Sequence, residues 1–127
     1  MRALAADLLG RSWFALAWWM VGVLAMGAYV AETCTGCHNE SLSGGPIAGG
    51  DPNWPPASNL TPGEDGVLTR YPTAEALTTM FRSGTRPDGS DIEAMPFESL
   101  KEFSDQDMAA LYTFLKTLTP RKTGEQG

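Results

Sequence analysis

The chain has 127 residues and a mass of 13.6 kDa, which is room for one domain and excludes multi-domain enzymes and repeat arrays. Hydrophobic residues make up 43% and charged residues 19%, which excludes a disordered chain and a polytopic membrane protein, while 14 Gly and 9 Pro predict a loop-rich fold. The 9 Lys and Arg against 15 Asp and Glu give a formal charge of −6, which argues against nucleic acid as a partner.

The first 31 residues differ in charge from the rest. Residues 1–31 hold two Arg and one Asp, whereas residues 32–127 hold the other 7 basic and 14 acidic side chains, a net −7. Ser12 to Ala31, SWFALAWWMVGVLAMGAYVA, are uncharged, and a helix of these 20 residues is about 30 Å long, the thickness of one hydrocarbon core. We expect residues 1–31 to form a cytoplasmic end and a transmembrane anchor, and residues 32–127 to form one separate domain outside the membrane.

A cleavable secretory signal is the alternative for this segment. Such signals usually have an apolar stretch of only about 7 to 15 residues that ends in a small-x-small site. The stretch here is longer, and cleavage at the best match, Ala25-Met26-Gly27, leaves six residues before Cys34, too few for an ordered helix. These features favour a retained anchor.

The charges that flank the span predict its orientation. Arg2 and Arg11 precede it and Glu32 follows it. The positive-inside rule then places the N-terminus in the cytoplasm and everything after residue 31 outside. We expect a single-pass protein of the bacterial inner (cytoplasmic) membrane with a periplasmic domain.

The chemistry is concentrated in one pentapeptide, Cys34-Thr35-Gly36-Cys37-His38, which contains both cysteines and the only histidine. Two thiols three residues apart near the end of a helix can both reach the vinyl groups along one haem edge, and the next residue then lies under the iron. The pattern predicts one covalent c-type haem, bound through Cys34 and Cys37, with His38 as the proximal iron ligand.

Three other interpretations fit the pentapeptide less well. A thioredoxin-like dithiol needs a βαβ context, whereas a Gly/Pro-rich loop follows here. A zinc site needs a fourth ligand, and the chain has no further Cys or His. A disulfide between residues 34 and 37 would close almost no loop and would leave the histidine unexplained.

Beyond the pentapeptide the pattern predicts helices joined by long connections. The first helix should run to about Asn39, followed by a loop over residues 40–70; a loop of this length is unusual in a compact domain unless a ligand such as haem organises it. Thr73 is a typical N-cap, and Ser104 with Asp107 forms a capping box. The predicted later helices cover residues 73–84, 97–103 and 105–118.

The second axial position of the iron needs another ligand, and Met80, Met95 and Met108 are the candidates outside the span. Met80 and Met108 lie on apolar faces of predicted helices, so both are expected in the core. Met95 follows a turn-forming run and precedes Pro96, so it lies in a loop that can present its sulfur to the iron. A thioether paired with an imidazole is common in electron-carrying haems, which favours Met95.

With these features in place, the chain resembles the class I monohaem cytochrome c family over about residues 28–120, and most of all the haem domains of membrane-bound dehydrogenase cytochrome subunits. The stretches that carry the resemblance are, in order, CTGCH, GGPIAGG, SNLTPGEDG, FRSGTRPDGSDIEAMPF and FSDQDMAALYTFLKTLTP. It implies an all-α class I cytochrome c fold with long haem-wrapping loops, here preceded by a single transmembrane helix.

The resemblance also implies roles for individual residues. It implies His38 and Met95 as the iron ligands, and the carbonyl of Pro46 as acceptor of the other ring proton of His38, a contact that fixes the ring orientation. It further suggests that Tyr71 and Asn59 lie near a haem propionate. For Tyr71, burial of an amphipathic ring is the alternative.

One feature departs from the family. Its members carry a Gly and an aromatic residue at set positions before the first Cys, and these pack against the C-terminal helix; Gly27 and Tyr29 are near these positions but out of the usual register. Between Ala31 and Cys34 there are only two residues and no flexible tether. We therefore expect the haem to lie close above the membrane at a nearly fixed height.

These observations predict one-electron transfer rather than catalysis. We expect a fixed relay in a larger membrane redox complex, with other subunits and redox donor and acceptor proteins as partners. A free membrane-anchored carrier between complexes is the alternative, and the net −7 of residues 32–127 would suit a partner with a basic face. A haem enzyme or gas sensor needs an open iron site, which a Met95 ligand closes.

Overall fold

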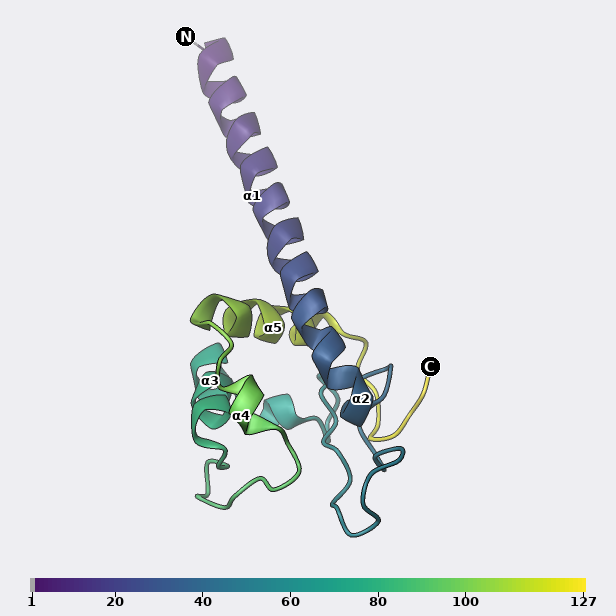
Figure 1. The fold of residues 1–127 in the computed structure, drawn as a ribbon. Coiled ribbons are helices and arrows are strands. Elements are labelled where there is room, and N and C mark those ends of the chain that lie inside the picture. Colours follow the sequence, from purple (N-terminus) through teal and green to yellow (C-terminus); the bar gives the residue numbers. More distant parts are fainter. Residues whose placement is uncertain (1) are drawn as a thin grey trace.

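The computed structural model describes the backbone of residues 2–127 and the side chains of residues 12–127, and this part of the chain is helical without a β-strand. Figure 1 shows one long helix that projects from a compact group of shorter helices and loops. The predicted all-α architecture is confirmed. In chain order the elements are α1 (Arg2–Ala31), η1 (Glu32–Cys34), α2 (Thr35–His38), η2 (Val67–Thr69), α3 (Ala74–Ser83), α4 (Phe97–Leu100) and α5 (Asp105–Thr117).

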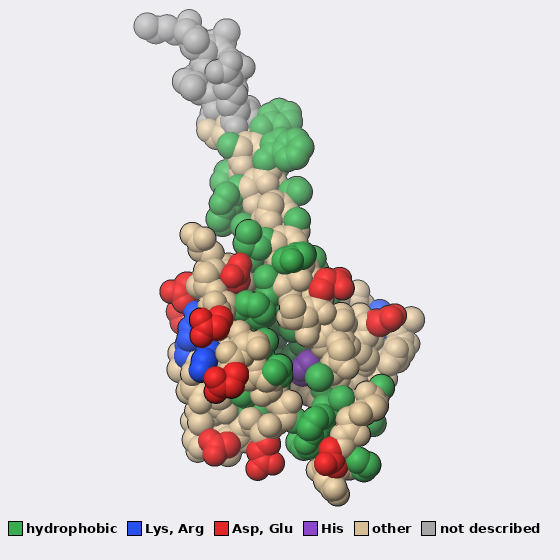
Figure 2. Space-filling model, viewed as in Figure 1, with side chains coloured by type: hydrophobic (Ala, Val, Ile, Leu, Met, Phe, Trp, Pro, Cys, Tyr) green, Lys and Arg blue, Asp and Glu red, His purple; other side chains and the backbone are tan. Residues whose placement is uncertain are grey.

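The projecting helix α1 continues through η1 and α2 without leaving helical backbone angles, so one rod reaches from Arg2 to His38. From Ser12 onward this rod is long and apolar enough to cross a membrane. Trp13, Phe14 and Trp18 have exposed fractions of 71% to 75%. In Figure 2 the coloured part of the rod carries hydrophobic side chains, whereas the charged side chains lie over the compact part below.

The lower third of α1 packs across α5, and Gly27 makes this crossing possible. A Cβ atom at Gly27 would collide with the carbonyl oxygen of Ala110 and would come within 2.6 Å of the Phe114 Cβ. Val30 and Ala31 are buried below the crossing, whereas Tyr29 has an exposed fraction of 80%. Gly27 therefore makes the helix contact expected of the family, and Tyr29 does not supply the aromatic partner.

Local capping signals set the ends of the two other main helices. The Thr73 hydroxyl accepts a hydrogen bond from the Ala76 N–H (3.1 Å) at the start of α3, and Gly84 ends that helix with a φ of 72°. Ser104 and Asp107 form the predicted capping box of α5. The sequence placed both helices correctly. The helix predicted over residues 97–103 is shorter in the structure, where α4 covers only Phe97–Leu100.

The core lies where α3, α5 and the end of α1 meet. Met108 and Leu111 of α5 are 0% and 1% exposed, and Leu77 and Phe81 of α3 pack in the same cluster. Val30 and Ala31 of α1 belong to that cluster, so the last turn of α1 packs with the compact part of the chain.

The C-terminal segment after α5 returns along the long loop between α2 and α3. The Gly124 N–H donates to the Ser43 carbonyl (3.1 Å), and the Ser43 hydroxyl donates to the Glu125 carbonyl (2.7 Å). The Asp65 carboxylate accepts from the Thr123 N–H and hydroxyl, at 2.9 and 2.6 Å. These hydrogen bonds hold a loop that has little regular structure of its own.

Candidate haem site

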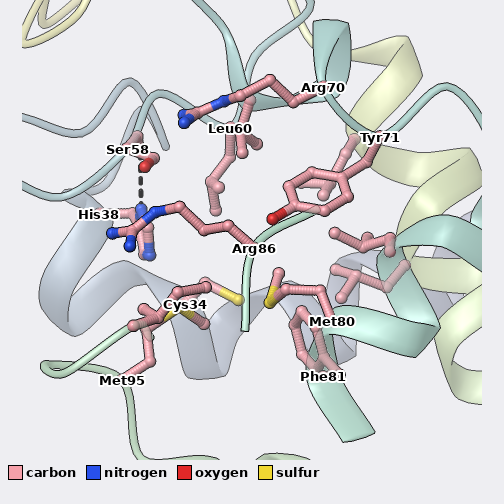
Figure 3. Close-up of a pocket in the computed structure, with 15 residues that line it drawn as sticks. Cys34, His38, Ser58, Leu60, Arg70, Tyr71, Met80, Phe81, Arg86 and Met95 are labelled. Atoms are coloured by element: carbon pink, nitrogen blue, oxygen red, sulfur yellow. Dashed lines mark hydrogen bonds between the residues drawn. The ribbon is translucent and has the colours of Figure 1, made fainter. Parts of the chain in front are cut away.

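A cleft of about 630 Å³, partly open to solvent, lies below the end of the helical rod. Most of its lining is apolar and comes from the long loop, α3, α5 and the segment before α4. Figure 3 shows the sulfur- and nitrogen-bearing side chains that point toward it. The apolar lining residues are Leu60, Val67, Leu77, Phe81, Ile92, Leu111 and Leu115.

His38 ends α2 at one wall of the cleft with one ring nitrogen already bonded. Its Nδ1 lies 2.7 Å from the carbonyl oxygen of Ser58. Because a carbonyl oxygen only accepts, Nδ1 carries the proton and Nε2 keeps the lone pair that a metal needs. Burial lowers the pKa of His38, and the Ser58 hydrogen bond opposes this in part. The neutral imidazole, the form that binds iron, is therefore favoured.

The prediction that the Pro46 carbonyl faces His38 is wrong, because Ser58 supplies that carbonyl. Gly44 and Gly45 both have positive φ and turn the chain away from the ring before Pro46. The turn is fixed by paired hydrogen bonds of 2.9 Å between Gly45 and Ala57, which bring the residue after Ala57 over His38. Pro46 lines a separate depression beside Cys37.

The two cysteines lie on the same helical turn but face different parts of the site. Cys34 lines the cleft, whereas Cys37 lines an adjoining pocket together with Pro55 and Pro56. Both are free thiols of intermediate exposure in the structure. Burial raises the pKa of the Cys34 thiol, which the hydrogen bond with Thr33 partly offsets. Their placement is consistent with two attachment points along one edge of a planar group.

Two methionines reach the cleft, and they differ in setting. Met80 lies on the buried face of α3 with an exposed fraction of 6%. Met95 lies in the loop before α4 and lines both the cleft and the adjoining pocket, as His38 does. The Phe97 N–H donates to the Met95 carbonyl (2.9 Å) and fixes the backbone there. Met108 is fully buried in the core, as predicted.

The two residues expected near a haem propionate lie in different settings. Tyr71 lines the cleft, and its hydroxyl points into it in Figure 3. Asn59 does not line the cleft, so the structure gives no support to a propionate contact there. Its amide donates to Asp65 (3.1 Å) and to the Arg121 carbonyl (2.7 Å), and its oxygen accepts from the Thr61 N–H and hydroxyl. With every hydrogen-bonding position filled inside the protein, Asn59 is a structural residue.

Sequence reasoning missed two arginines that line the cleft. Arg70 precedes Tyr71, and Arg86 lies in the turn after α3, where its guanidinium donates to the Asp91 carbonyl (2.6 Å) and to the Ser90 hydroxyl (3.2 Å). Two cations beside an apolar cleft are the complement that two propionate groups require. The available signal was the position of Arg70 beside Tyr71, which the resemblance had already singled out.

The side chains around the cleft fit a haem. They combine apolar walls with an imidazole nitrogen, thioether sulfurs, two thiols and two guanidinium groups. Among residues 12–127 no group of three His, Cys, Asp or Glu side chains is placed to hold a bare metal ion. A porphyrin iron needs only two axial ligands from the protein, so this donor set suits haem and not a metal ion alone.

Comparison with protein families agrees with this chemistry. The family model described as cytochrome c matches residues 25–119, which is most of the chain. The chain belongs to the cytochrome c family. It is accordingly a haem protein of the covalent c type, and the family indicates electron transfer. The match begins at residue 25, inside α1, which agrees with the packing of that part of α1 on α5.

Similar proteins include cytochrome subunits of dehydrogenases. The chain is 35% identical over 100 residues to the cytochrome c subunit of alcohol dehydrogenase (quinone) from Gluconobacter oxydans (strain 621H), covering 72% of this chain and 20% of the relative. It is 34% identical over 97 residues to the gluconate 2-dehydrogenase cytochrome c subunit of Pantoea cypripedii, covering 69% and 21%. The chain thus spans about a fifth of the length of these relatives. Comparison with solved structures gave no match.

Proposed function

We propose that this cytochrome is a fixed one-electron relay, anchored in a membrane and built into a larger redox complex. The observation that carries this proposal is the unbroken helical rod from Ser12 to His38, which joins an apolar projecting helix to the haem site without a flexible tether. When bound, haem supplies a one-electron cycle between ferric and ferrous iron. The chain's own residues attach it, orient it and limit the access of water to it.

Cys34 and Cys37 are the proposed attachment points and His38 is the proposed proximal ligand. The thiols would form thioethers with the haem vinyl groups, and His38 would present Nε2 because Ser58 holds the other ring nitrogen. Met95 is the proposed second ligand, since it lines the cleft from a loop and not from the core face of a helix. Tyr71, Arg70 and Arg86 are the proposed neighbours of the propionates.

A retained anchor is supported by the packing of α1. Cleavage after Gly27 would remove the residue at which α1 crosses α5, together with the helical turns that precede the buried Val30 and Ala31. The flanking charges support a cytoplasmic N-terminus and a haem domain on the periplasmic side of a bacterial inner membrane. Residues 1–31 then serve as anchor, with the last turns shared with the haem domain.

The proposed partners are the other subunits of a membrane dehydrogenase or similar complex. Support comes from the relatives named as dehydrogenase cytochrome subunits and from the absence of a Pro/Gly/Ser-rich linker between Ala31 and Cys34. A carrier that moves between complexes usually swings on such a linker. The haem here is held at one height above the membrane.

Purification from native membranes in a mild detergent tests this proposal. We expect the cytochrome to elute with stoichiometric partner subunits, one of them carrying a further cofactor, at both low and high salt. Elution as a monomer whose reduction by added partners slows steeply with salt would instead support the free membrane-anchored carrier, because transient docking depends on complementary charge.

A further inference from the structure

Two grooves flank the crossing of α1 and α5, and only one of them is lined by charged side chains. The first, which we call the upper groove, lies toward the N-terminal end of α1 and is lined by residues that include Trp19, Gly22 and Met26 of α1 and Ala109 and Thr113 of α5; none of its lining residues is charged. The second, the lower groove, lies toward α2 and is lined by residues that include Glu32, Glu40 and Arg121.

The uncharged free part of α1 is too short for a membrane span. The uncharged stretch is Ser12 to Ala31, but residues from Val23 onward face or pack against α5. Only 11 residues of this stretch, Ser12 to Gly22, stand clear of the compact domain, and they extend about 16 Å as a helix, whereas a hydrocarbon core is about 30 Å thick. The helix continues back to Arg2, but Asp7 and Arg11 make that part costly to place in hydrocarbon. The remaining apolar length is therefore the part of α1 that is packed on α5.

We propose that the haem domain is partly sunk into the lipid bilayer, with lipid acyl chains filling the upper groove and the headgroup layer at the level of the α1–α5 crossing. This inference rests on the proposed anchor. It states in addition which surface of the domain contacts lipid. It places the uncharged groove in the membrane and the charged groove in water, with Gly27 between them. The uncharged side chains of the upper groove then face lipid, and the charged side chains of the lower groove face water.

The side chains around the crossing fit this placement. Met26 and Tyr29 have exposed fractions of 49% and 80%, although they stand beside the compact domain. An exposed tyrosine with an apolar ring and a polar tip is typical of the membrane interface. The upper groove has two polar side chains, Thr113 and Gln106. The Thr113 hydroxyl donates to the Ala109 carbonyl at 2.9 Å, and Gln106 lies in the first turn of α5, at the headgroup layer in this placement.

The charged side chains of α5 lie at its two ends. Asp105 begins the helix and is paired with Arg82, and Lys116 is in its last turn over the ring of Tyr112. The uncharged middle of α5 is the part that crosses α1 in Figure 1. A shallow contact with the bilayer thus leaves the charged ends at the headgroup layer.

Fluorescence quenching on the haem-loaded full chain in vesicles of phosphatidylethanolamine and phosphatidylglycerol tests this inference. Three variants each carry one new cysteine for an environment-sensitive fluorophore: Ala109→Cys in the upper groove, Glu40→Cys in the lower groove, and Ala15→Cys in the projecting helix. The native cysteines are expected to be blocked as thioethers. Energy transfer to the haem shortens the fluorophore lifetime, so at each position the two quenchers are compared with each other, which this shortening affects alike. The haem spectrum reports folding.

We expect the label at position 109 to be quenched several-fold more by nitroxide-bearing lipid than by iodide, like the label at position 15, and the label at position 40 to show the reverse. Quenching at 109 by iodide, with lipid quenching kept at 15, would overturn the inference and leave the anchor intact. Protection of 109 from both quenchers would mean that protein covers the groove, which also overturns it. Failure of the chain to float with vesicles would refute the anchor itself.

Discussion

At the scale of single residues, the proposed iron ligation can be tested with two methionines that line the same cleft. Met95→Leu removes the loop thioether, so we expect the ferrous protein to bind carbon monoxide, because the sixth position opens. Met80→Leu replaces a buried helical residue by one of similar volume and should leave the sixth position of the iron occupied. Absorption spectra with and without carbon monoxide distinguish them. Binding by the Met80 variant alone would assign the iron to Met80.

Arg86 gives a second test at this scale. Its positive charge beside the cleft favours the reduced haem and compensates the propionates, so Arg86→Gln should lower the reduction potential by tens of millivolts, which corresponds to roughly 1 kcal/mol of lost attraction at an effective dielectric of about 20. Arg82→Gln is the matched control, since Arg82 is paired with Asp105 outside the cleft. Equal potentials in a redox titration of the two variants would remove Arg86 from the site.

The sequence predicted the side chains of the site better than its backbone contacts. Cys34, Cys37 and His38 share one motif, and Met95 lies in a loop with a clear turn signal, so local pattern is sufficient for them. The carbonyl of Ser58 has no side-chain signature, and its position depends on a pairing of Gly45 with Ala57 across a long loop. Such contacts follow from the tertiary path of the chain.

At the scale of elements, the crossing of α1 and α5 predicts that alanine substitution of two glycines on the same helix changes the stability of the domain differently. Gly27→Ala places a methyl group against the Ala110 backbone and should destabilise the haem domain by about 1–3 kcal/mol. Gly22→Ala meets no atom within 4 Å and should be neutral or slightly stabilising. Denaturant midpoints in detergent, followed by haem absorption, measure both. Equal midpoints would show that the crossing is not formed.

The C-terminal segment depends on Asp65, whose pKa is lowered to about 2 by hydrogen bonds from the Thr123 hydroxyl and N–H and from Asn59. Because the unfolded pKa is about 3.9, this contribution to stability is fully present above pH 4 and is lost as the pH falls toward 2. The hydrogen-exchange protection factors of the Thr123 and Gly124 amides, taken relative to the intrinsic rate at each pH, should therefore fall over that range.

The variant Asp65→Asn should lose this protection even at neutral pH, and trypsin should cleave after Arg121 and Lys122 faster than in the parent chain. Glu64→Gln changes the neighbouring carboxylate, which is exposed, and serves as the control. If both variants are cleaved at the parent rate, the Asp65–Thr123 contact does not hold the segment.

The helices of the domain could be predicted because their ends carry local signals. The caps Thr73 and Ser104 and the terminating Gly84 act within one turn, and the structure has each of them in place. The limit between anchor and domain has no such signal, because Val23 to Ala31 are as apolar as the rest of the span. Their burial follows from the crossing at Gly27, which composition does not reveal.

At the scale of the whole molecule, the helical rod links membrane position to haem position. From Gly27 at the crossing to His38 the rod advances 11 residues, about 16 Å as a helix, so the proposed placement fixes the height of the proposed iron ligand above the headgroup layer. A haem held in this way exchanges electrons with cofactors at a similar height. This geometry favours a relay between neighbouring subunits over a carrier that reaches distant ones.

The intact mass of the protein purified from its membrane tests the central claim most directly, which is that one haem is joined by two thioethers to a chain that keeps its anchor. We predict a mass that includes residues 1–31 and one haem, and no reaction of either cysteine with an alkylating reagent after denaturation. A chain that begins near Ala28, or one without haem and with two alkylated thiols, would contradict the account.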